Sequence, residues 1–196
     1  MKHSIRFLLV MATLLAGITA SAQRVAVKTD LLDDALLNPN AGVEIKIASK
    51  WSFELLGQLN AWELDHGSKM WKHWMAMPEV RYWLCDVWDG HFFGIHAFGG
   101  QYNIGGLKGM GKFLGTDFGK LADYRFQGPF VGAGIAYGYD WILGRHWNIE
   151  AEIGIGWSYT RYDQFRCVGC GKQLRDNVPH HYVGPTKAAI NIVYIF

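Results

Sequence analysis

The chain has 196 residues, half of them apolar and 15% aromatic, with 19 basic against 17 acidic residues. Two of the bases lie within the first 22 residues, so the rest is balanced in charge and offers no basic surface for nucleic acid. Beyond those residues no apolar run reaches the roughly 18 residues that a membrane-spanning helix requires. Abundant glycine and aromatic residues therefore favour a β-barrel, with a secreted soluble β-protein as the alternative.

The first 22 residues have the features of an export signal. Lys2 and Arg6 give a positive start, residues 7–18 form a short apolar segment, and Ala20-Ser21-Ala22 is a small-x-small cleavage site. We expect cleavage after Ala22, which leaves residues 23–196 as one domain. Because the new first residue is not Cys, the sequence does not favour a lipid-anchored form.

The rest of the chain contains eight segments in which apolar and polar residues alternate, which is the period of a β-strand. Short polar or glycine-containing stretches separate these segments and predict turns and loops. In chain order the predicted strands are 24–29, 42–48, 51–60, 73–84, 91–103, 124–139, 147–160 and 181–196. An even number of antiparallel strands is typical of single-chain bacterial outer-membrane barrels.

The strand at 147–160 gives the clearest pattern. From Trp147 to Tyr159 every second residue is apolar, with aliphatic residues in the middle and aromatic residues at the ends. The residues between them are polar or small. A face of this kind fits a strand that crosses lipid and is anchored at two headgroup layers.

The predicted connections alternate in length, at roughly 10, 2, 12, 6, 20, 6 and 19 residues, as expected for short periplasmic turns and long extracellular loops. The two longest are 104–123, with a short helix near 112–121, and 162–180. Aromatic residues are also predicted to gather at two levels. The inner level contains Trp51, Tyr82, Tyr139, Trp147 and Phe196, and the outer level contains Trp62, Trp74, Tyr124, Tyr159 and Tyr182. The sequence therefore predicts an all-β, eight-stranded, up-and-down transmembrane barrel in the outer membrane of a Gram-negative bacterium.

The faces opposite the apolar ones carry charged residues. Five acids match five bases when Arg24 is counted, so we predict a self-paired charge network inside the barrel, because isolated charges would be too costly there. A proton or ion pathway through part of this set is the alternative. The predicted network contains Lys28, Glu44, Lys46, Glu54, Glu79, Arg81, Glu150, Glu152 and Lys187.

One short motif has the spacing of a metal site. Cys167 and Cys170 form a CxxC followed by glycine, and His180 and His181 lie in the same predicted outer loop, so the four could bind zinc. Because thiols outside the cytoplasm tend to be oxidised, a disulfide between Cys167 and Cys170 is the favoured alternative. No strand serine accompanies the outer histidines except Ser158, which would face inward, and this disfavours an enzyme.

Several segments together resemble a known family. VAVKTDLL, MPEVRYWLCD, GHFFGIHAFGGQYN and YVGPTKAAINIVYIF, with the CxxCGK loop and the long segment from 123 to 157, resemble a Bacteroidetes-type outer-membrane barrel family of unknown function. The resemblance implies a small barrel, and members are sometimes linked with fimbrial loci. It implies no catalytic residues.

These observations predict a non-enzymatic outer-membrane protein whose two long outer loops contact a surface component, which the resemblance suggests is related to fimbriae. A narrow conduit for a small or apolar solute is the alternative. The final residues include Tyr194 and Phe196, and an aromatic end of this kind is expected to be read by the outer-membrane insertion machinery. Expected partners are thus lipid, that machinery and a surface protein, with no cofactor other than zinc in the outer loop.

Overall fold

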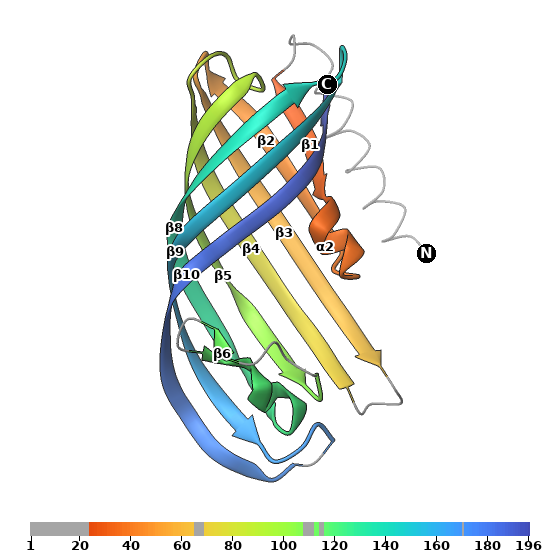
Figure 1. Ribbon diagram of the computed structural model, residues 1–196, viewed down its shortest axis with the longest axis vertical. Helices are drawn as coiled ribbons and strands as arrows, with labels where there is room; N and C mark the ends of the chain where they lie inside the picture. The colour runs from red at the N-terminus through yellow and green to blue at the C-terminus, as the bar shows by residue number, and fades with distance from the viewer. Residues whose placement is uncertain (1–23, 65–68, 108–111, 114–115, 170) are drawn as a thin grey trace, which may run out of the picture.

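The computed structural model describes residues 24–64, 69–107, 112–113, 116–169 and 171–196 (Figure 1). Its main sheet is a closed barrel of antiparallel strands in the order β1-β10-β9-β8-β5-β4-β3-β2. Two short strands, β6 (Lys112–Phe113) and β7 (Thr116–Asp117), pair separately. The barrel strands are β1 (Val25–Asp30), β2 (Asn40–Ala48), β3 (Trp51–Leu64), β4 (Lys69–Trp83), β5 (Gly90–Gly105), β8 (Arg125–Ile142), β9 (Trp147–Phe165) and β10 (Gln173–Ile195). The predicted all-β architecture with eight antiparallel strands is confirmed.

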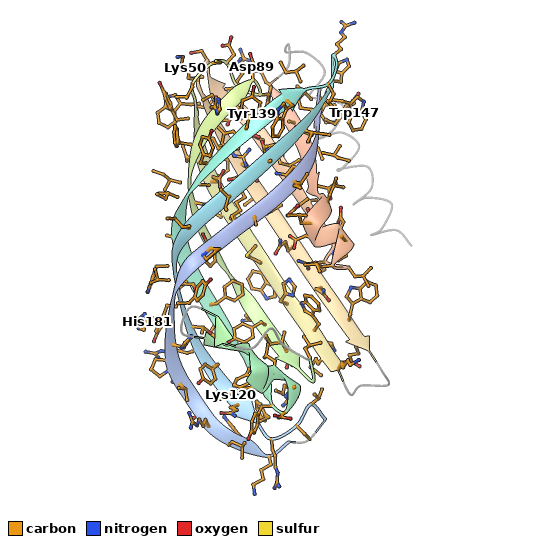
Figure 2. All side chains as sticks on the ribbon, viewed as in Figure 1. Lys50, Asp89, Lys120, Tyr139, Trp147 and His181 are labelled. Carbon is orange, nitrogen blue, oxygen red and sulfur yellow. The ribbon has the colours of Figure 1, made fainter. Side chains whose placement is uncertain are left out.

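Alternation along each strand decides which side chains face the interior. In β9, Glu150 is fully buried, whereas Ile153 and Ile155 are about 60% exposed. The same alternation runs through the neighbouring strands, so apolar residues cover much of the outside and polar residues collect inside (Figure 2). The period-2 pattern of the sequence therefore correctly predicts the inside and outside of the sheet.

The two ends of the barrel differ in their connections. We call the end with the short connections 49–50, 84–89 and 143–146 the inner end, and the opposite end the outer end. Between β5 and β8 the outer end holds the long connection that was predicted, and its 3-10 helix η2 (Phe118–Ala122) lies within the predicted helical region apart from its last residue. Part of that connection, residues 108–111 and 114–115, lies outside the described residues.

The prediction of a second long outer loop at 162–180 is wrong. Strands β9 and β10 continue as a hairpin, and only residues 166–172 connect them. Alternation persists beyond Thr160, where inward-facing Tyr162 packs against Phe126 with ring centroids 5.4 Å apart. The predicted loop between β3 and β4 is also shorter, because the two strands pair as far as Leu64 and Lys69. The strict alternation of long and short connections is therefore not observed.

A short helix that the sequence analysis missed joins β1 to β2. Helix α2 (Leu31–Ala35) begins after Asp30, whose carboxylate accepts a hydrogen bond from the Leu32 backbone N–H and so caps the helix. Asp33 and Asp34 in the first turn suit the positive end of the helix dipole. The same Asp30 carboxylate accepts the N–H of Ile190 on β10 at 3.0 Å, which ties this connection to the barrel wall.

The predicted aromatic levels are correct at the inner end and partly wrong at the outer end. Figure 2 places Tyr139 and Trp147 near the inner end and His181 toward the outer end. At the outer level, Trp74 faces outward, whereas Tyr182 follows the inward row of β10. Trp62 also follows the inward row of β3, and its indole N–H donates to the Leu37 carbonyl at 2.6 Å. These two rings therefore do not belong to an outward-facing girdle.

The interior is filled in three layers. At the inner end an apolar cluster closes the barrel, and it includes Val87 and Trp88 from the turn between β4 and β5. A layer of ion pairs lies above this cluster. Toward the outer end, Phe130 lies about 6 Å from both Phe98 and Tyr102. The apolar cluster consists of Ala26, Trp83, Val87, Trp88, Phe92, Val193 and Ile195.

Candidate functional site in the barrel interior

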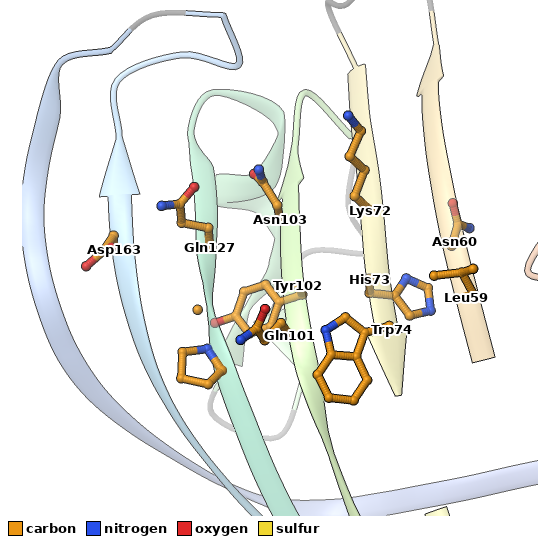
Figure 3. A pocket seen from close by; sticks show the side chains of 12 residues that line it. Leu59, Asn60, Lys72, His73, Trp74, Gln101, Tyr102, Asn103, Gln127 and Asp163 are labelled. Carbon is orange, nitrogen blue, oxygen red and sulfur yellow. The ribbon is translucent and has the colours of Figure 1, made fainter. Parts of the chain in front are cut away.

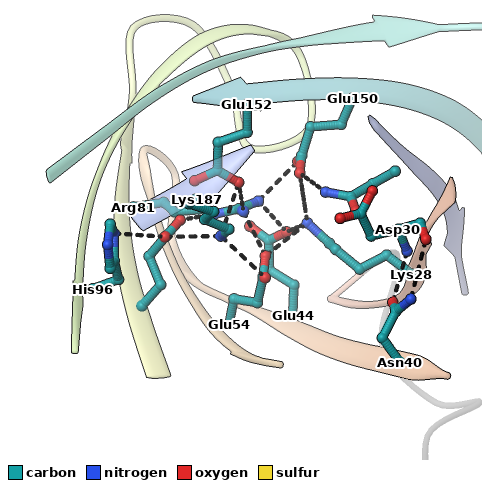
Figure 4. A network of polar contacts seen from close by, with 12 residues as sticks. Lys28, Asp30, Asn40, Glu44, Glu54, Arg81, His96, Glu150, Glu152 and Lys187 are labelled. Atoms are coloured by element: carbon teal, nitrogen blue, oxygen red, sulfur yellow. Dashed lines mark hydrogen bonds and ion pairs between the residues drawn. The ribbon is translucent and has the colours of Figure 1, made fainter. Parts of the chain in front are cut away.

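Eight charged residues from six strands meet in the middle layer of the barrel (Figure 4). We call them the ion-pair cluster. Each is on the inward face of its strand, which is the outcome of the alternation described above. The members are Lys28 on β1, Glu44 on β2, Glu54 on β3, Glu79 and Arg81 on β4, Glu150 and Glu152 on β9, and Lys187 on β10.

Arg81 lies at the centre of the cluster. Its Nε donates to Glu79 at 2.5 Å, and its two terminal nitrogens contact the other four glutamates of the cluster at 2.6–3.2 Å. The guanidinium carbon also lies 4.5 Å from the centre of the Phe92 ring, which belongs to the apolar cluster. A planar guanidinium presents five N–H donors, so one Arg81 side chain can contact carboxylates from four strands.

Two lysines complete the cluster from opposite sides. The Lys28 ammonium lies 2.6 Å from Glu44 and 2.9 Å from Glu54. The Lys187 ammonium lies 2.9 Å from both Glu79 and Glu152. Lys28 lies on β1 and Lys187 on β10, the first and last strands of the barrel, whose pairing closes the sheet. The cluster therefore crosslinks the closing pair to β2, β3, β4 and β9.

Neutral side chains satisfy further carboxylate oxygens. Ser52 donates to Glu44 at 2.5 Å and accepts from the Trp83 indole N–H at 2.8 Å, while Asn191 donates to Glu150 at 2.7 Å. On the outer side of the cluster, His96 lies 3.5 Å from Glu79 and 2.9 Å from the hydroxyl of Thr186. These contacts extend the polar layer across the barrel.

The cluster has more acids than bases. Three cations face five carboxylates, and each of these side chains is at most 5% exposed. Buried charges are tolerated only when they are paired and hydrogen-bonded. An eight-stranded barrel has room for side chains but not for an open aqueous channel, and here the side chains are in direct contact. The arrangement is suited to closing the barrel interior.

Comparison with known proteins places the chain in a family. The family model described as "Protein of unknown function (DUF3575)" matches residues 7–196. The chain belongs to the DUF3575 family. No curated protein and no solved structure matches it. Membership agrees with the predicted resemblance to a family of unknown function, whereas the outer-membrane and Bacteroidetes parts of that resemblance stay predictions.

This DUF3575 chain brings together all but one of the charged residues that the sequence suggested. Lys46 is the exception, because it is half-buried near the inner end of β2 and has no ion pair with the cluster among the described residues. The balance of five acids and five bases is also wrong. The reason is position: Arg24 and Lys46 lie so close to the inner end that their side chains reach solvent.

Sequence reasoning missed the inner closure of this DUF3575 barrel. The turn between β4 and β5 was predicted only as a connection, yet Trp88 is 4% exposed and adopts a positive φ of 69°. Its carbonyl accepts a hydrogen bond from Asn148 at 2.9 Å. Two bulky apolar residues, Val87 and Trp88, inside a short polar turn were the available signal.

The predicted zinc site is not formed by its described members. Cys167 is in a disulfide bond and therefore cannot supply a thiolate, which agrees with the disulfide alternative, while Cys170 lies outside the described residues. His180 and His181 are consecutive on β10 and point to opposite faces, with His181 packed on Tyr159 outside the barrel. Among the described residues, no three metal-ligating side chains gather.

The last residues of the described chain lie beside the first strand. The Phe196 N–H donates to the Val25 carbonyl at 3.0 Å, and Tyr194 packs against Phe196 with ring centroids 5.0 Å apart. Tyr194 also contacts Trp147, so these rings form part of the inner aromatic level. No helix within the described ranges is both long and apolar enough to cross a bilayer.

Proposed function

We propose that this protein is a non-enzymatic outer-membrane β-barrel whose interior is closed by the ion-pair cluster and whose outer end contacts another component of the cell surface. The observation that carries the proposal is the distribution of side chains. Arg81, Glu44 and Glu150 are buried inside, whereas isoleucines and aromatic rings are exposed outside. This is the reverse of a water-soluble protein and matches a barrel surrounded by lipid.

The height of the apolar belt supports this placement. On β9 it runs from Trp147 to Trp157, both of which are about half exposed. Ten residues of strand at about 3.3 Å each, tilted by about 40°, span about 25 Å, which is the height of the apolar band of outer-membrane barrels. On the inner side, Trp51 and Tyr82 pair at the same rim, with ring centroids 5.0 Å apart.

The placement is tested by extracting membranes of cells that make the full chain. The protein should stay in the membrane fraction after alkaline carbonate or urea, and it should migrate faster on gels before boiling than after, because a folded barrel resists the detergent. A soluble periplasmic protein made in the same cells serves as the extraction control. Release of the chain with that control would contradict the proposal.

We expect no steady conductance from the purified protein in planar bilayers, because the cluster and the apolar layer beneath it fill the interior. Arg81 alone contacts carboxylates from β2, β3, β4 and β9. A known porin measured in the same bilayers provides the positive control. Reproducible single-channel steps from this chain would favour the alternative, a narrow conduit.

The contact with a surface component is proposed for the outer end. This end carries the connection between β5 and β8 and the hairpin of β9 and β10, which extends beyond the aromatic residues Trp157 and Tyr159. Residues 173–177 of that hairpin are exposed. The resemblance stated above suggests a fimbria-related partner, and the outer end is the part of the proposed barrel that such a partner would reach.

A further inference from the structure

A groove of about 510 Å³ lies on the outward face of the sheet, near the outer end (Figure 3). It crosses β3, β4, β5, β8 and β9. Leu59 and Trp74, which are 65% and 46% exposed, show that its walls face away from the barrel interior. The inner wall is the paired row Leu59, Trp74, Gln101 and Pro129, and the outer wall is the paired row Lys72, Asn103, Gln127 and Asp163.

The groove forms where the sheet is locally open. The pairing between β8 and β9 is continuous from Phe130 inward but skips Gly128 and Pro129. Proline has no N–H to donate to a neighbouring strand, so the ladder cannot close at that position. The Pro129 carbonyl instead accepts a hydrogen bond from the Thr160 hydroxyl at 2.8 Å. This interruption lies at the β8–β9 side of the groove.

The two walls differ in chemistry. The inner wall presents the apolar residues Leu59, Trp74 and Pro129 together with the amide of Gln101, and it lies on the side of the lipid-facing belt. The outer wall is polar, and its Asn103 Oδ1 is buried without a hydrogen-bond partner among the described residues. The groove therefore straddles the level at which the acyl chains of a lipid would meet its headgroup.

The charged side chains of the outer wall already have partners. Lys72 pairs with Glu63, and the Asp163 carboxylate accepts the N–H of Asn177 at 2.9 Å. A phosphate would therefore compete with Glu63 for Lys72 and would be repelled by the Asp163 carboxylate. The side-chain amides of Gln101, Asn103 and Gln127 each offer donors and an acceptor, which matches hydroxyl groups that both donate and accept. An exposed indole beside them provides an apolar surface for a sugar ring.

We propose that this groove binds the sugar headgroup of a glycolipid in the outer leaflet, with the acyl chains of the lipid along the inner wall. The inference rests on the proposed membrane placement, because only a barrel in lipid presents this face to a glycolipid. It adds a ligand that the closed interior and the outer connections do not involve.

The test is native mass spectrometry of the full chain in a zwitterionic detergent without sugar. A monoglucosyl diacylglycerol should bind saturably as one molecule per chain. Phosphatidylethanolamine with the same acyl chains should bind at least tenfold more weakly. Free glucose, tested separately, should also bind at least tenfold more weakly. The double variant Asn103→Leu/Gln127→Leu should weaken glycolipid binding at least tenfold. Gln173→Leu makes the same kind of change on an exposed residue outside the groove and should leave binding unchanged.

Both variants are first shown to be folded by their heat-modifiable migration. Equal binding of the phospholipid, equal binding of free glucose, or glycolipid binding that is insensitive to the double variant would each overturn the proposal. If the chain is extracted from membranes with soluble proteins, the proposed function itself fails. If the chain stays in the membrane but binds no glycolipid, only the proposal that the groove binds a glycolipid is contradicted.

Discussion

Replacing Arg81 with methionine is expected to lower the free energy of unfolding by about 3–5 kcal/mol, the cost of breaking a buried ion pair by removing one partner. Methionine keeps much of the aliphatic volume but removes every donor. All five glutamates of the cluster contact Arg81, and its side chain is fully buried, so water cannot replace the lost contacts. Lys28 and Lys187 would then be left with five carboxylates.

The measurement is urea unfolding of the protein refolded into lipid vesicles, followed by tryptophan fluorescence. Lys46→Met is the matched control, because Lys46 is on the same inward face but outside the ion-pair cluster. We expect this control to change stability by less than about 0.5 kcal/mol, as for most residues away from buried networks. Arg81→Lys should fall between the two, since an ammonium cannot reproduce the planar fork. Equal effects of Arg81→Met and Lys46→Met would refute the central role of Arg81.

The sequence predicted the barrel because the physical cause of its pattern is local. Each strand places successive side chains on opposite faces, so the alternation within a run such as 147–160 is enough to predict which of its residues face inward and which face outward. The same rule placed Glu150, Glu152 and Lys187 on inward faces. Their meeting in one layer then followed from closure of the sheet.

Long-range geometry limited what could be predicted. Lys46 and Lys28 look equivalent in the alternation, but only the height of a residue along the barrel decides whether its side chain reaches Arg81. The register between strands sets that height, and the register depends on the whole closed sheet. The β9–β10 hairpin at the outer end was missed for a related reason. Beyond Thr160 the two strands consist mainly of polar residues, and they are stabilised there by pairing with each other, which the sequence of one strand does not show.

The groove could not have been inferred from the sequence at all. Trp74, Asn103 and Gln127 are far apart in the chain and come together through the register of β4, β5 and β8. Pro129 was a visible signal of a local defect in a strand, but its consequence depends on which residues flank it in the neighbouring strands. The partial failure of the outer aromatic level also depends on register, because the shift between Pro185 and Lys187 changes which residues of β10 face inward and so places Tyr182 on the inward row.

Replacing Ile153 with arginine is the second change for which we expect a large effect, a loss of about 2–4 kcal/mol in the free energy of unfolding. Ile153 lies on β9 between Trp147 and Trp157, close to the middle of the apolar belt, and it is 60% exposed. If the belt faces lipid, an arginine there must place its charge near the centre of the bilayer. If the belt faces water, an exposed isoleucine can be replaced at a cost within about 0.5 kcal/mol.

Ile47→Arg is the matched control for this prediction. Ile47 is 64% exposed, like Ile153, but it lies one residue before the end of β2 at the inner rim. A charge at the membrane interface costs only about 0–1 kcal/mol, so the two variants should differ by at least about 1 kcal/mol in vesicles. The same urea titration of vesicle-embedded protein measures both. Because the two side chains are equally exposed, equal and small effects would show that the apolar belt is not surrounded by lipid, and the placement of this chain in a membrane would be wrong.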